Sequence, residues 1–567
     1  MDAVTGSSIC RTRRCHLEDG HIKIRPRTNV NRIRVAVSYS VCDGLRLYFF
    51  IGPPHNPASY LMPYNRISSL LFLLALTIAW SCNAHGQRAQ DPETAAEMAM
   101  ETAEAIEKYE QAIKQHQEAI DTNPNDIAAH LNLSGAYRTV GRYADAEAQA
   151  RKAVAIDDAS GTALMTVGEL LYLQGKYNEA EAQLKQAVAS RNVDPAAHLH
   201  LGRLYLDTGR KTEAQEQFRA TIRLYQQGRA QSADGVTVAA LASKYIERFH
   251  DANNLFMEAI RLPGNQLDAY VAWGNLFLEK YNRKVATVTF EDALKIDSAY
   301  PPALAGLADA LSETRTSLAE AKALQALNIN PGLVEARHLL ARLYLDDEQY
   351  DAAVAQLEQA LEVNPESSAT RSLLAACYNA MGKEDAYEAE VRRVLDINPL
   401  YGQLYATIAD NLSRRYRFVE AIEMGRKAIE LDPRLWTAYA GLGVNLSRVG
   451  KEEEARKYLD QSFAGDSFNV YTLNTLNLFD SIDEYTTHVS DNFILKLDKD
   501  EDPVYGKLAL DLLEQAHRTI SPRYGFKPER QTLVEIFPEH NDFAVRISGL
   551  PGAGALLGVC FGEVVVA

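Results

Sequence analysis

A repeat with a period of 34 residues constrains this chain more than any other feature of its sequence. Three stretches that begin at Asn132, Thr166 and His200 align with one another without gaps. The positions that recur in them are Ser134, Gly168 and Gly202, then Gly141, Gly175 and Gly209, and then Ala146, Ala180 and Ala214. Further along the chain, Pro331, Pro365, Pro399 and Pro433 are again 34 residues apart. Such a period predicts stacked copies of one supersecondary unit.

The chemistry of the recurring positions predicts that each unit is a pair of packed helices. A small residue in the first helix lets the second helix approach it closely. Glycine tolerates the left-handed backbone of a loop between two helices. Proline cannot continue a helix interior, so it separates one unit from the next. We therefore expect an all-α superhelical solenoid of about ten to eleven helix hairpins over residues 95–465, of which the first is partial.

Together with aromatic residues such as Tyr137 and Tyr205, these positions resemble the tetratricopeptide repeat family. The resemblance implies that the first helices line a concave groove, and that the groove binds extended peptides or partner helices. The candidate groove-facing residues are Glu169, Arg203, His338, Arg342, Asn379 and Asp410. Because this set mixes both charges, the carboxylate clamp of some family members is not carried over to it. The alternative for each residue is a solvated face with no fixed ligand.

Two stretches interrupt the phase of the repeat. Residues 224–236 and 262–267 carry glycine, proline and polar residues that do not fit the 34-residue pattern. We expect a bend or an irregular seam in the array between residues 225 and 265.

The front of the chain predicts an exported protein. Residues 62–86 begin with Met62 and contain an apolar run of eleven residues, from Leu70 to Trp80, followed by small residues. This run is too short to cross a bilayer comfortably and is typical of a signal peptide. Residues 1–61 are then either a disordered basic extension or the product of a start assigned too early. Cys82 is a candidate for lipidation. No transmembrane span is expected once the signal peptide is removed.

Residues 468–567 have a different texture and predict a small α+β unit. Alternating polar and apolar residues near 491–498 and 531–538 indicate strands, and helical spacing covers 503–520. Together with the glycine-rich stretch before residue 562, these elements resemble the first part of a peptidase MA-like, gluzincin-type domain. The resemblance implies a zinc site on a later HExxH helix, but the sequence contains no HExxH, so we expect truncation before that motif and no cofactor without the missing part.

Charge narrows the range of partners. The chain has a formal net charge of −16, and residues 1–61 are basic, so the remainder is strongly acidic and repels nucleic-acid phosphates. The main hypothesis is therefore a non-catalytic, exported scaffold that binds proteins or peptides in the periplasm or cell envelope of a Gram-negative-type bacterium. The alternative is a truncated zinc metallopeptidase whose repeat array recruits substrates.

Overall fold

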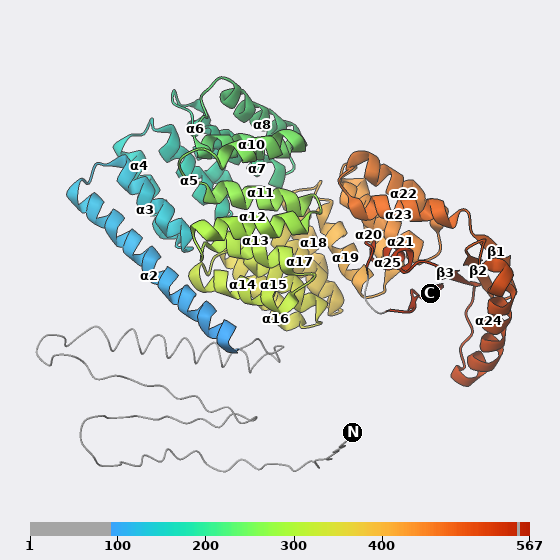
Figure 1. Cartoon of the computed structure of the whole chain (residues 1–567). Coiled ribbons are helices and arrows are strands. Elements are labelled where there is room, and N and C mark those ends of the chain that lie inside the picture. Colours follow the sequence, from blue (N-terminus) through green and yellow to red (C-terminus); the bar gives the residue numbers. More distant parts are fainter. Residues whose placement is uncertain (1–91, 553–555) are drawn as a thin grey trace, which may run out of the picture. The chain divides into compact units, whose positions relative to one another are not determined.

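The chain was examined as a computed structural model that describes residues 92–552 and 556–567, with side chains from residue 96 onward. In this part of the chain one long helix, α2 (Pro92–Thr122), is followed by ten helix hairpins and then by a small unit with a sheet (Figure 1). The predicted fold class, a superhelical helix-hairpin solenoid followed by a small α+β unit, is confirmed. The basic extension, the signal peptide and the lipidation of Cys82 lie outside the described residues.

The hairpins occupy residues 127–465, and α2 takes the place of the second helix of the expected partial unit. In order, they are α3 (Ile127–Thr139) with α4 (Tyr143–Ile156), α5 (Gly161–Leu173) with α6 (Tyr177–Ala189), α7 (Pro195–Asp207) with α8 (Lys211–Gln226), α9 (Ala233–Tyr245) with α10 (Phe249–Ala259), α11 (Leu267–Glu279) with α12 (Arg283–Ile296), α13 (Pro301–Leu311) with α14 (Thr316–Ile329), α15 (Val334–Asp346) with α16 (Tyr350–Val363), α17 (Ser368–Ala380) with α18 (Glu384–Ile397), α19 (Gln403–Arg414) with α20 (Phe418–Leu431), and α21 (Trp436–Arg448) with α22 (Glu452–Gly465).

Short polar side chains start several of the first helices. Asp126, Ser160 and Asp194 each accept a hydrogen bond from a backbone N–H group in the first turn of α3, α5 and α7. A cap of this kind satisfies an amide that has no partner inside the helix. The three caps are 34 residues apart, so the repeat sets the helix starts as well as the loops.

The loop between the two helices of a hairpin, called the hairpin loop below, has a left-handed residue in nine of the ten hairpins, and the exception is the loop between α13 and α14. Glycine fills this position at Gly141, Gly175, Gly209, Gly382 and Gly450, with φ between 67° and 78°. The expectation from the three sequence glycines is therefore confirmed. Non-glycine residues adopt the same conformation at Glu247, Tyr281, Glu348 and Tyr416, where no glycine marks the loop.

The recurring small residues stand where two helices of one hairpin meet. A Cβ atom on Gly202 would lie 2.5 Å from the ring of Phe218, and one on Gly168 would lie 2.6 Å from Leu184. These distances are shorter than any van der Waals contact allows, so the close approach that the pattern predicts is confirmed.

The first helices of successive hairpins also contact one another, from α3 with α5 through to α19 with α21. They therefore form the inner layer of the array, and the second helices form the outer layer. Around the predicted irregular seam, α8 has 16 residues and α10 has 11. The bend itself stays a prediction.

The array also makes contacts between residues that are far apart in the sequence. Hydrogen bonds and ion pairs join residues separated by 186 to 192 positions. We name α2–α11 the first superhelical turn and α12–α22 the second, and we call these contacts the ladder. Each contact joins an element of the first superhelical turn to the end of a second helix in the next.

The middle of the ladder pairs hairpin loops with asparagines. Asn330 Nδ2 donates to the carbonyl of Thr139 at 3.2 Å, and Asn398 Nδ2 donates to that of Leu206 at 3.1 Å. The amide oxygens of Asn330, Asn364 and Asn398 lie so close to Gly141, Gly175 and Gly209 that a Cβ there would be 2.2, 2.4 and 2.7 Å away. These glycines are therefore required by the second superhelical turn as well as by their own loops.

Charged groups form the two ends of the ladder. At the start, Tyr109 and Lys108 on α2 contact Asp297 at 2.9 and 3.0 Å. At the other end, Lys280 Nζ lies 3.1 Å from Asp466 Oδ2, and both side chains are about nine-tenths buried. The second superhelical turn is thus fixed to the first along its whole length.

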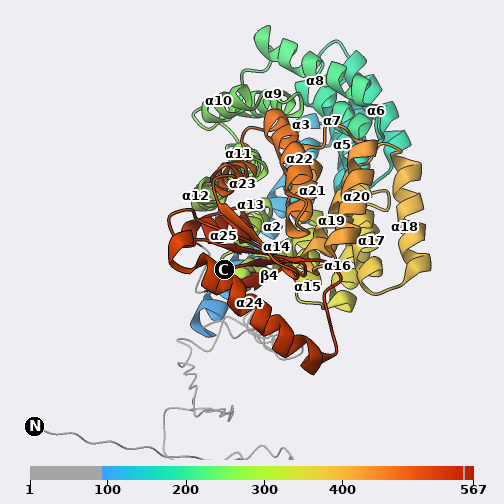
Figure 2. The same cartoon turned by 90° about the vertical axis from the view of Figure 1, so that its right-hand side faces the viewer.

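The C-terminal unit begins with α23 (Val470–Ile482) and contains one five-stranded sheet. The strands are β1 (Thr486–Val489), β2 (Phe493–Leu497), β3 (Thr532–Ile536), β4 (Val559–Cys560) and β5 (Val564–Val566), in the order β1-β2-β3-β5-β4. The pairs β2–β3 and β3–β5 are parallel and the other two are antiparallel. Helix α24 (Asp502–Tyr524) lies along one face of the sheet (Figure 2), and Leu533, Val564 and Val566 on the other face pack with residues of α20–α22.

Two features of this unit differ from the sequence prediction. Helix α25 (His540–Ser548) occupies a stretch for which no helix was predicted, and it ends at Gly549, which has φ of 76°. Helix α23 and strand β1 were not predicted either. The predicted strands near 491–498 and 531–538 and the helix over 503–520 are confirmed as β2, β3 and α24.

Candidate binding site on the inner face

The six predicted groove-facing residues all lie on first helices and therefore in the inner layer. Glu169 is on α5, Arg203 on α7, His338 and Arg342 on α15, Asn379 on α17 and Asp410 on α19. The structure brings Glu169 and Arg203 into one cluster in the first superhelical turn. The other four lie in the second superhelical turn and form separate local contacts.

The first cluster is built around Glu169. Arg138 Nη1 on α3 lies 2.8 Å from Glu169 Oε1, and its second nitrogen lies 3.9 Å from Asp268 on α11. Burial is the largest single influence and acts to raise the pKa of Glu169, but Arg138, His200 and Arg203 together outweigh it and hold that pKa below its usual value. Tyr300, which precedes α13, donates to Asp268 at 2.5 Å. The inner face here is a polar network that crosses several hairpins.

Arg203 is the member of this cluster that forms no salt bridge, although Asp207 and Glu169 act on its charge from a longer distance. Its guanidinium lies 5.1 Å from the centre of the Tyr172 ring, and the hydroxyl of Tyr172 donates to Asp207 at 2.6 Å. Among the residues that the structure describes, no carboxylate lies within ion-pair distance of Arg203 and no hydrogen bond satisfies its donors. A half-buried guanidinium with free donors is suited to receive an acidic group.

His200 completes the wall beside Arg203. It is 8% exposed, its Nε2 lies 3.8 Å from Glu169, and its Nδ1 has no partner in the described structure. Burial lowers the pKa of His200 to about 4, so the ring is neutral at pH 7. The positive charge open to a ligand at this point therefore comes from Arg203, because Arg138 is paired with Glu169.

The residues of the second superhelical turn are already satisfied by neighbours. Arg342 Nη2 lies 3.0 Å from Asp309, and Asp410 lies 3.0 Å from Arg414. His338 Nε2 lies 2.8 Å from the hydroxyl of Thr370, and burial lowers its pKa to about 3. Asn379 is the exception, because its buried Oδ1 has no partner in the described structure.

Sequence reasoning missed Arg138, Tyr172 and His200. The first two were accessible to it, because Tyr172 stands three residues after Glu169, and Arg138 occupies in α3 the position that Tyr172 occupies in α5. The burial of His200 depends on contacts between different hairpins, and the repeat pattern does not predict those contacts.

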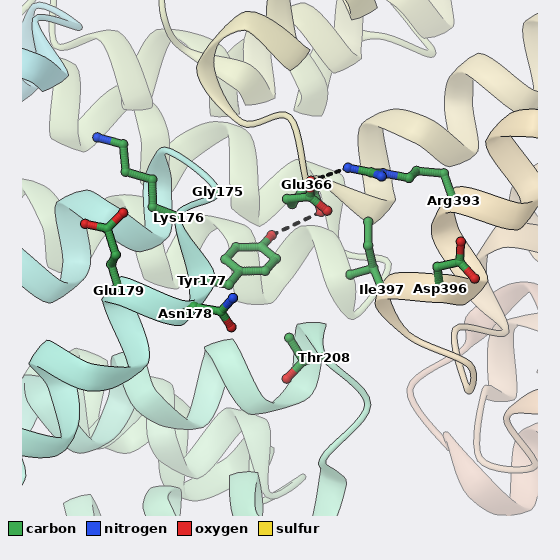
Figure 3. Close-up of a pocket in the computed structure, with 10 residues that line it drawn as sticks. All are labelled: Gly175, Lys176, Tyr177, Asn178, Glu179, Thr208, Glu366, Arg393, Asp396 and Ile397. Atoms are coloured by element: carbon green, nitrogen blue, oxygen red, sulfur yellow. Dashed lines mark hydrogen bonds and ion pairs between the residues drawn. The ribbon is translucent and has the colours of Figure 1, made fainter.

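A second hollow lies on the ladder, between the two superhelical turns (Figure 3). This crevice of about 520 Å³ is lined by residues 175–179 and 208 on one side and by Glu366, Arg393, Asp396 and Ile397 on the other. Tyr177 donates to the carbonyl of Glu366 at 3.3 Å, and Arg393 lies 2.5 Å from the carboxylate of Glu366. Arg393 and Glu366 pair with each other on one side of the crevice, and Lys176 on the other side pairs with Glu147, so the crevice offers a ligand less than Arg203 does.

Two kinds of feature are absent from the residues that the structure describes. Within residues 92–552 and 556–567, no group of three His, Cys, Asp or Glu side chains is placed to hold a metal ion. No helix in the same ranges has the length and apolar character needed to cross a membrane.

Comparisons with known proteins identify the repeat. Family models described as tetratricopeptide repeat match residues 100–161 and 168–229, and a second such model matches residues 344–410. Among solved structures, yeast Tom70 is 16% identical, with 69% of this chain and 97% of that chain covered and a TM-score of 0.33. A tetratricopeptide repeat protein from Parabacteroides merdae ATCC 43184 is 19% identical, with 44% and 98% covered and a TM-score of 0.32. No curated protein matches.

The matched ranges fall on α2–α8 and on α15–α19. They therefore coincide with hairpins that the 34-residue period had predicted. The likeness of residues 468–567 to a peptidase MA-like domain stays a prediction. The chain thus contains tetratricopeptide repeats, and repeats of this kind imply protein partners.

Proposed function

We propose that the chain is a scaffold that binds an extended segment of a partner protein on the inner face of the first superhelical turn. In this proposal Arg203 receives an acidic group of the partner. The observation that carries it is the guanidinium of Arg203, which is held against Tyr172 without a salt bridge, whereas Arg138 and Arg342 of the same layer pair with carboxylates at 2.8 and 3.0 Å. The repeats support a protein ligand rather than a small molecule.

Energetics favour an acidic ligand at this position. A hydrogen bond to a charged group contributes about 1.5 to 3 kcal/mol, whereas an exposed ion pair contributes at most about 1 kcal/mol. Arg203 is half-buried, and stacking on Tyr172 orders its guanidinium before any ligand arrives. A ligand carboxylate therefore gains a bidentate contact without having to displace an existing partner.

The test uses a library of fluorescently labelled peptides and the full-length protein. Binding is measured by fluorescence anisotropy for peptides with acidic side chains and for matched peptides in which Glu and Asp are replaced by Gln and Asn. We expect the acidic peptides to bind selectively, and Arg203→Ala to weaken that binding by about tenfold to 100-fold. Equal binding of the acidic and the amide peptides would contradict the proposal.

Arg342→Ala is the matched control. Arg342 also lies on a first helix, but Asp309 already occupies its guanidinium at 3.0 Å. Removal of the Arg342 side chain is expected to change the affinity for acidic peptides by less than about threefold, because its charge is already paired with Asp309. Equal losses in the two variants would show that overall charge, rather than the free Arg203, controls binding.

We further propose that the scaffold is exported and acts in the cell envelope. The support is the run of residues 62–86, with its basic flank, short apolar core and small residues. Fractionation of a Gram-negative host that produces the full chain is expected to recover it with the periplasm or membranes. Metabolic labelling with a fatty acid, compared between the parent and Cys82→Ser, tests the lipid anchor.

The alternative function, a zinc peptidase, rests on the resemblance of residues 468–567 alone. No observation on the described residues favours it, so the scaffold is the function that we propose.

A further inference from the structure

A buried ionic cluster lies where the repeat array meets the C-terminal unit. Arg546 on α25 donates from Nε to Glu535 Oε2 on β3 at 2.7 Å, and from Nη1 to the hydroxyl of Ser447 at the end of α21 at 2.7 Å. Its Nη2 donates to the carbonyl of Ser447 at 3.2 Å. The side chains of Arg546 and Glu535 are 1% and 0% exposed. We call this contact region the junction.

A second carboxyl group faces Glu535 across the junction. Glu452 is the first residue of α22, and it forms an ion pair with Lys496 on β2. The Oε1 atoms of Glu452 and Glu535 are both buried and have no other partner in the described structure. Lys496, the ion-pair partner of Glu452, is also the register partner of Glu535 on the neighbouring strand, so the two carboxyl groups converge on the same point of the junction.

Two ionised carboxylates cannot hydrogen-bond to each other, because both are acceptors only. A single proton placed between them gives each unsatisfied oxygen a partner and removes the repulsion between like charges. If the second carboxylate stayed ionised and buried without a counter-charge, the loss of its hydration would destabilise the junction by several kcal/mol.

We propose that Glu452 and Glu535 share one proton, and that this proton latches the C-terminal unit onto the repeat array so that the junction loosens as the pH rises. In the latched state the carboxyl group of Glu535 donates its O–H to the carboxylate of Glu452. When the pH rises, a base in solution removes the proton, and two carboxylates then face each other beside the fixed charges of Arg546 and Lys496.

Charged and titratable groups surround the pair on every packed element. Arg546 comes from α25, Lys496 from β2, Arg448 from α21, and Tyr485 from the segment between α23 and β1. Burial is the largest cause that raises the pKa of Glu535, which reaches about 7, and Glu452 raises it further against the opposing effect of Arg546. Burial also acts to raise the pKa of Glu452, but hydrogen bonds with Glu535 and Lys496 hold it below its usual value.

The direction of the pH effect follows from these two shifts. Glu535 has a raised pKa, so its stabilising contribution is complete below the usual carboxyl value of 4.5 and is lost as the pH rises through about 7. Glu452 has a lowered pKa, so its contribution is present above 4.5 and is lost at lower pH. The junction is therefore tightest near pH 4.5 and weakens toward pH 7, with the two groups titrating as a pair.

The latch acts alongside apolar contacts that do not titrate. Phe561 packs against Phe418 with ring centres 5.9 Å apart and lies 6.3 Å from the ring of Tyr416. The loosened state thus exposes aromatic surface of both the array and the C-terminal unit. Residues of the ladder, far from the junction, are expected to be unaffected.

The test measures hydrogen–deuterium exchange of the full-length protein from pH 5 to pH 8, corrected for the pH dependence of intrinsic exchange. In peptides covering β3, α25 and the start of α22, we expect protection to fall by about tenfold or more across this range. Peptides covering α5 and α6 serve as the internal reference and are expected to keep constant protection. Infrared spectroscopy provides the second readout, because the shared proton gives the carbonyl band of a protonated carboxylic acid at pH 6.

Two variants separate the latch from simple damage to the fold. Glu535→Gln keeps a donor facing Glu452 at every pH, so its protection is expected to be independent of pH and its infrared band at pH 6 to be absent. Glu452→Gln leaves Glu535 paired with Arg546 and also removes the pH dependence. Glu454→Gln, on the exposed side of α22, is the control and is expected to behave like the parent.

Several outcomes would overturn the proposal. In the unsubstituted protein, these outcomes are junction protection that does not change with pH and the absence of the carboxylic acid band. In Glu535→Gln, the contradicting outcome is protection that changes with pH as it does in the unsubstituted protein. A loss of protection that is equal in α5 and α6 would show global unfolding instead of a latch. If Glu535→Gln fails to fold, the infrared band of the parent and the Glu452→Gln variant still decide the question.

Discussion

The same hairpin loop occurs in two settings in this molecule. Gly175, in the first superhelical turn, has φ of 73° and lies under Asn364 of the second superhelical turn. Gly382, in the second superhelical turn, has φ of 67°, and no atom lies within 4 Å of the place where its Cβ would stand. The loop at Gly175 is covered by Asn364, which follows much later in the chain, and we call it closed. The loop at Gly382 is not covered, and we call it open.

This difference separates two roles of one residue type. At Gly382 the glycine serves only the left-handed backbone of its own loop. At Gly175 it also leaves room for the ladder. A tetratricopeptide array is usually described as a sum of neighbour contacts, but the ladder adds contacts between hairpins that are several units apart. We expect the first superhelical turn to respond to changes in the second.

The largest expected effect comes from the buried end of the ladder. Asp466→Ala leaves Lys280 buried without a counter-charge, which is expected to cost about 4 kcal/mol of unfolding free energy. Chemical denaturation followed by circular dichroism measures the loss. Arg434→Ala breaks the ladder's exposed pair with Glu247 and is expected to cost less than about 1 kcal/mol. Equal losses would mean that the ladder's burial has no energetic consequence.

Adding a methyl group to the two glycine loops is expected to have an intermediate effect. Gly382→Ala introduces only the strain of a left-handed alanine, about 1 kcal/mol. Gly175→Ala adds a collision with Asn364 and is expected to cost about 2 to 3 kcal/mol in all. Urea midpoints of the two variants and the parent give the comparison. A cost for Gly382→Ala as large as that for Gly175→Ala would remove the distinction between the open and the closed loop.

The smallest expected effect is at the non-glycine loops. Glu348→Gly relieves a left-handed side chain and loses only a contact of 3.3 Å with Arg415, so it is expected to stabilise the protein by about 1 kcal/mol. Glu247→Gly relieves the same strain but also breaks the ladder contact with Arg434, so its gain is expected to be smaller by about 0.5 kcal/mol. Thermal unfolding of both variants measures the difference.

The sequence predicted the parts of the fold that depend on contacts within a single hairpin. Gly141, Gly175 and Gly209 marked the hairpin loops, and the small residues opposite Leu184 and Phe218 marked the close helix contacts. Both signals are local, since they reflect one hairpin and recur with its period. The prediction missed four hairpin loops in which the left-handed residue is not glycine. These residues are Glu247, Tyr281, Glu348 and Tyr416.

The ladder could be predicted only in part. Asn330, Asn364 and Asn398 stand directly before the recurring prolines, so their period was visible. The loop that each of them contacts depends on how many hairpins complete one superhelical turn, and that number is a property of the assembled array. Helix α25 was missed for a different reason, since its nine residues include only a short apolar pattern.

The candidate site was predicted better in its location than in its chemistry. The helical pattern placed Glu169 and Arg203 on first helices, and the structure brings both into one cluster. Whether an arginine is free or paired depends on residues from other hairpins. Asp309 satisfies Arg342 and no described carboxylate satisfies Arg203, and neither fact could be read from a single hairpin.

Zero-length crosslinking with a carbodiimide tests most directly whether the two superhelical turns are joined, because it couples only amines and carboxylates already in contact. On the full-length protein, contact between the two superhelical turns predicts a bond between Lys108 and Asp297 of the ladder, which lie 3.0 Å apart, and a bond between Lys211 and Asp432, a further ion pair of 2.8 Å between the two turns. The bond between Lys176 and Glu147 of adjacent hairpins, at 2.9 Å, is the internal control. Detection of the control bond without the two long-range bonds would contradict the account.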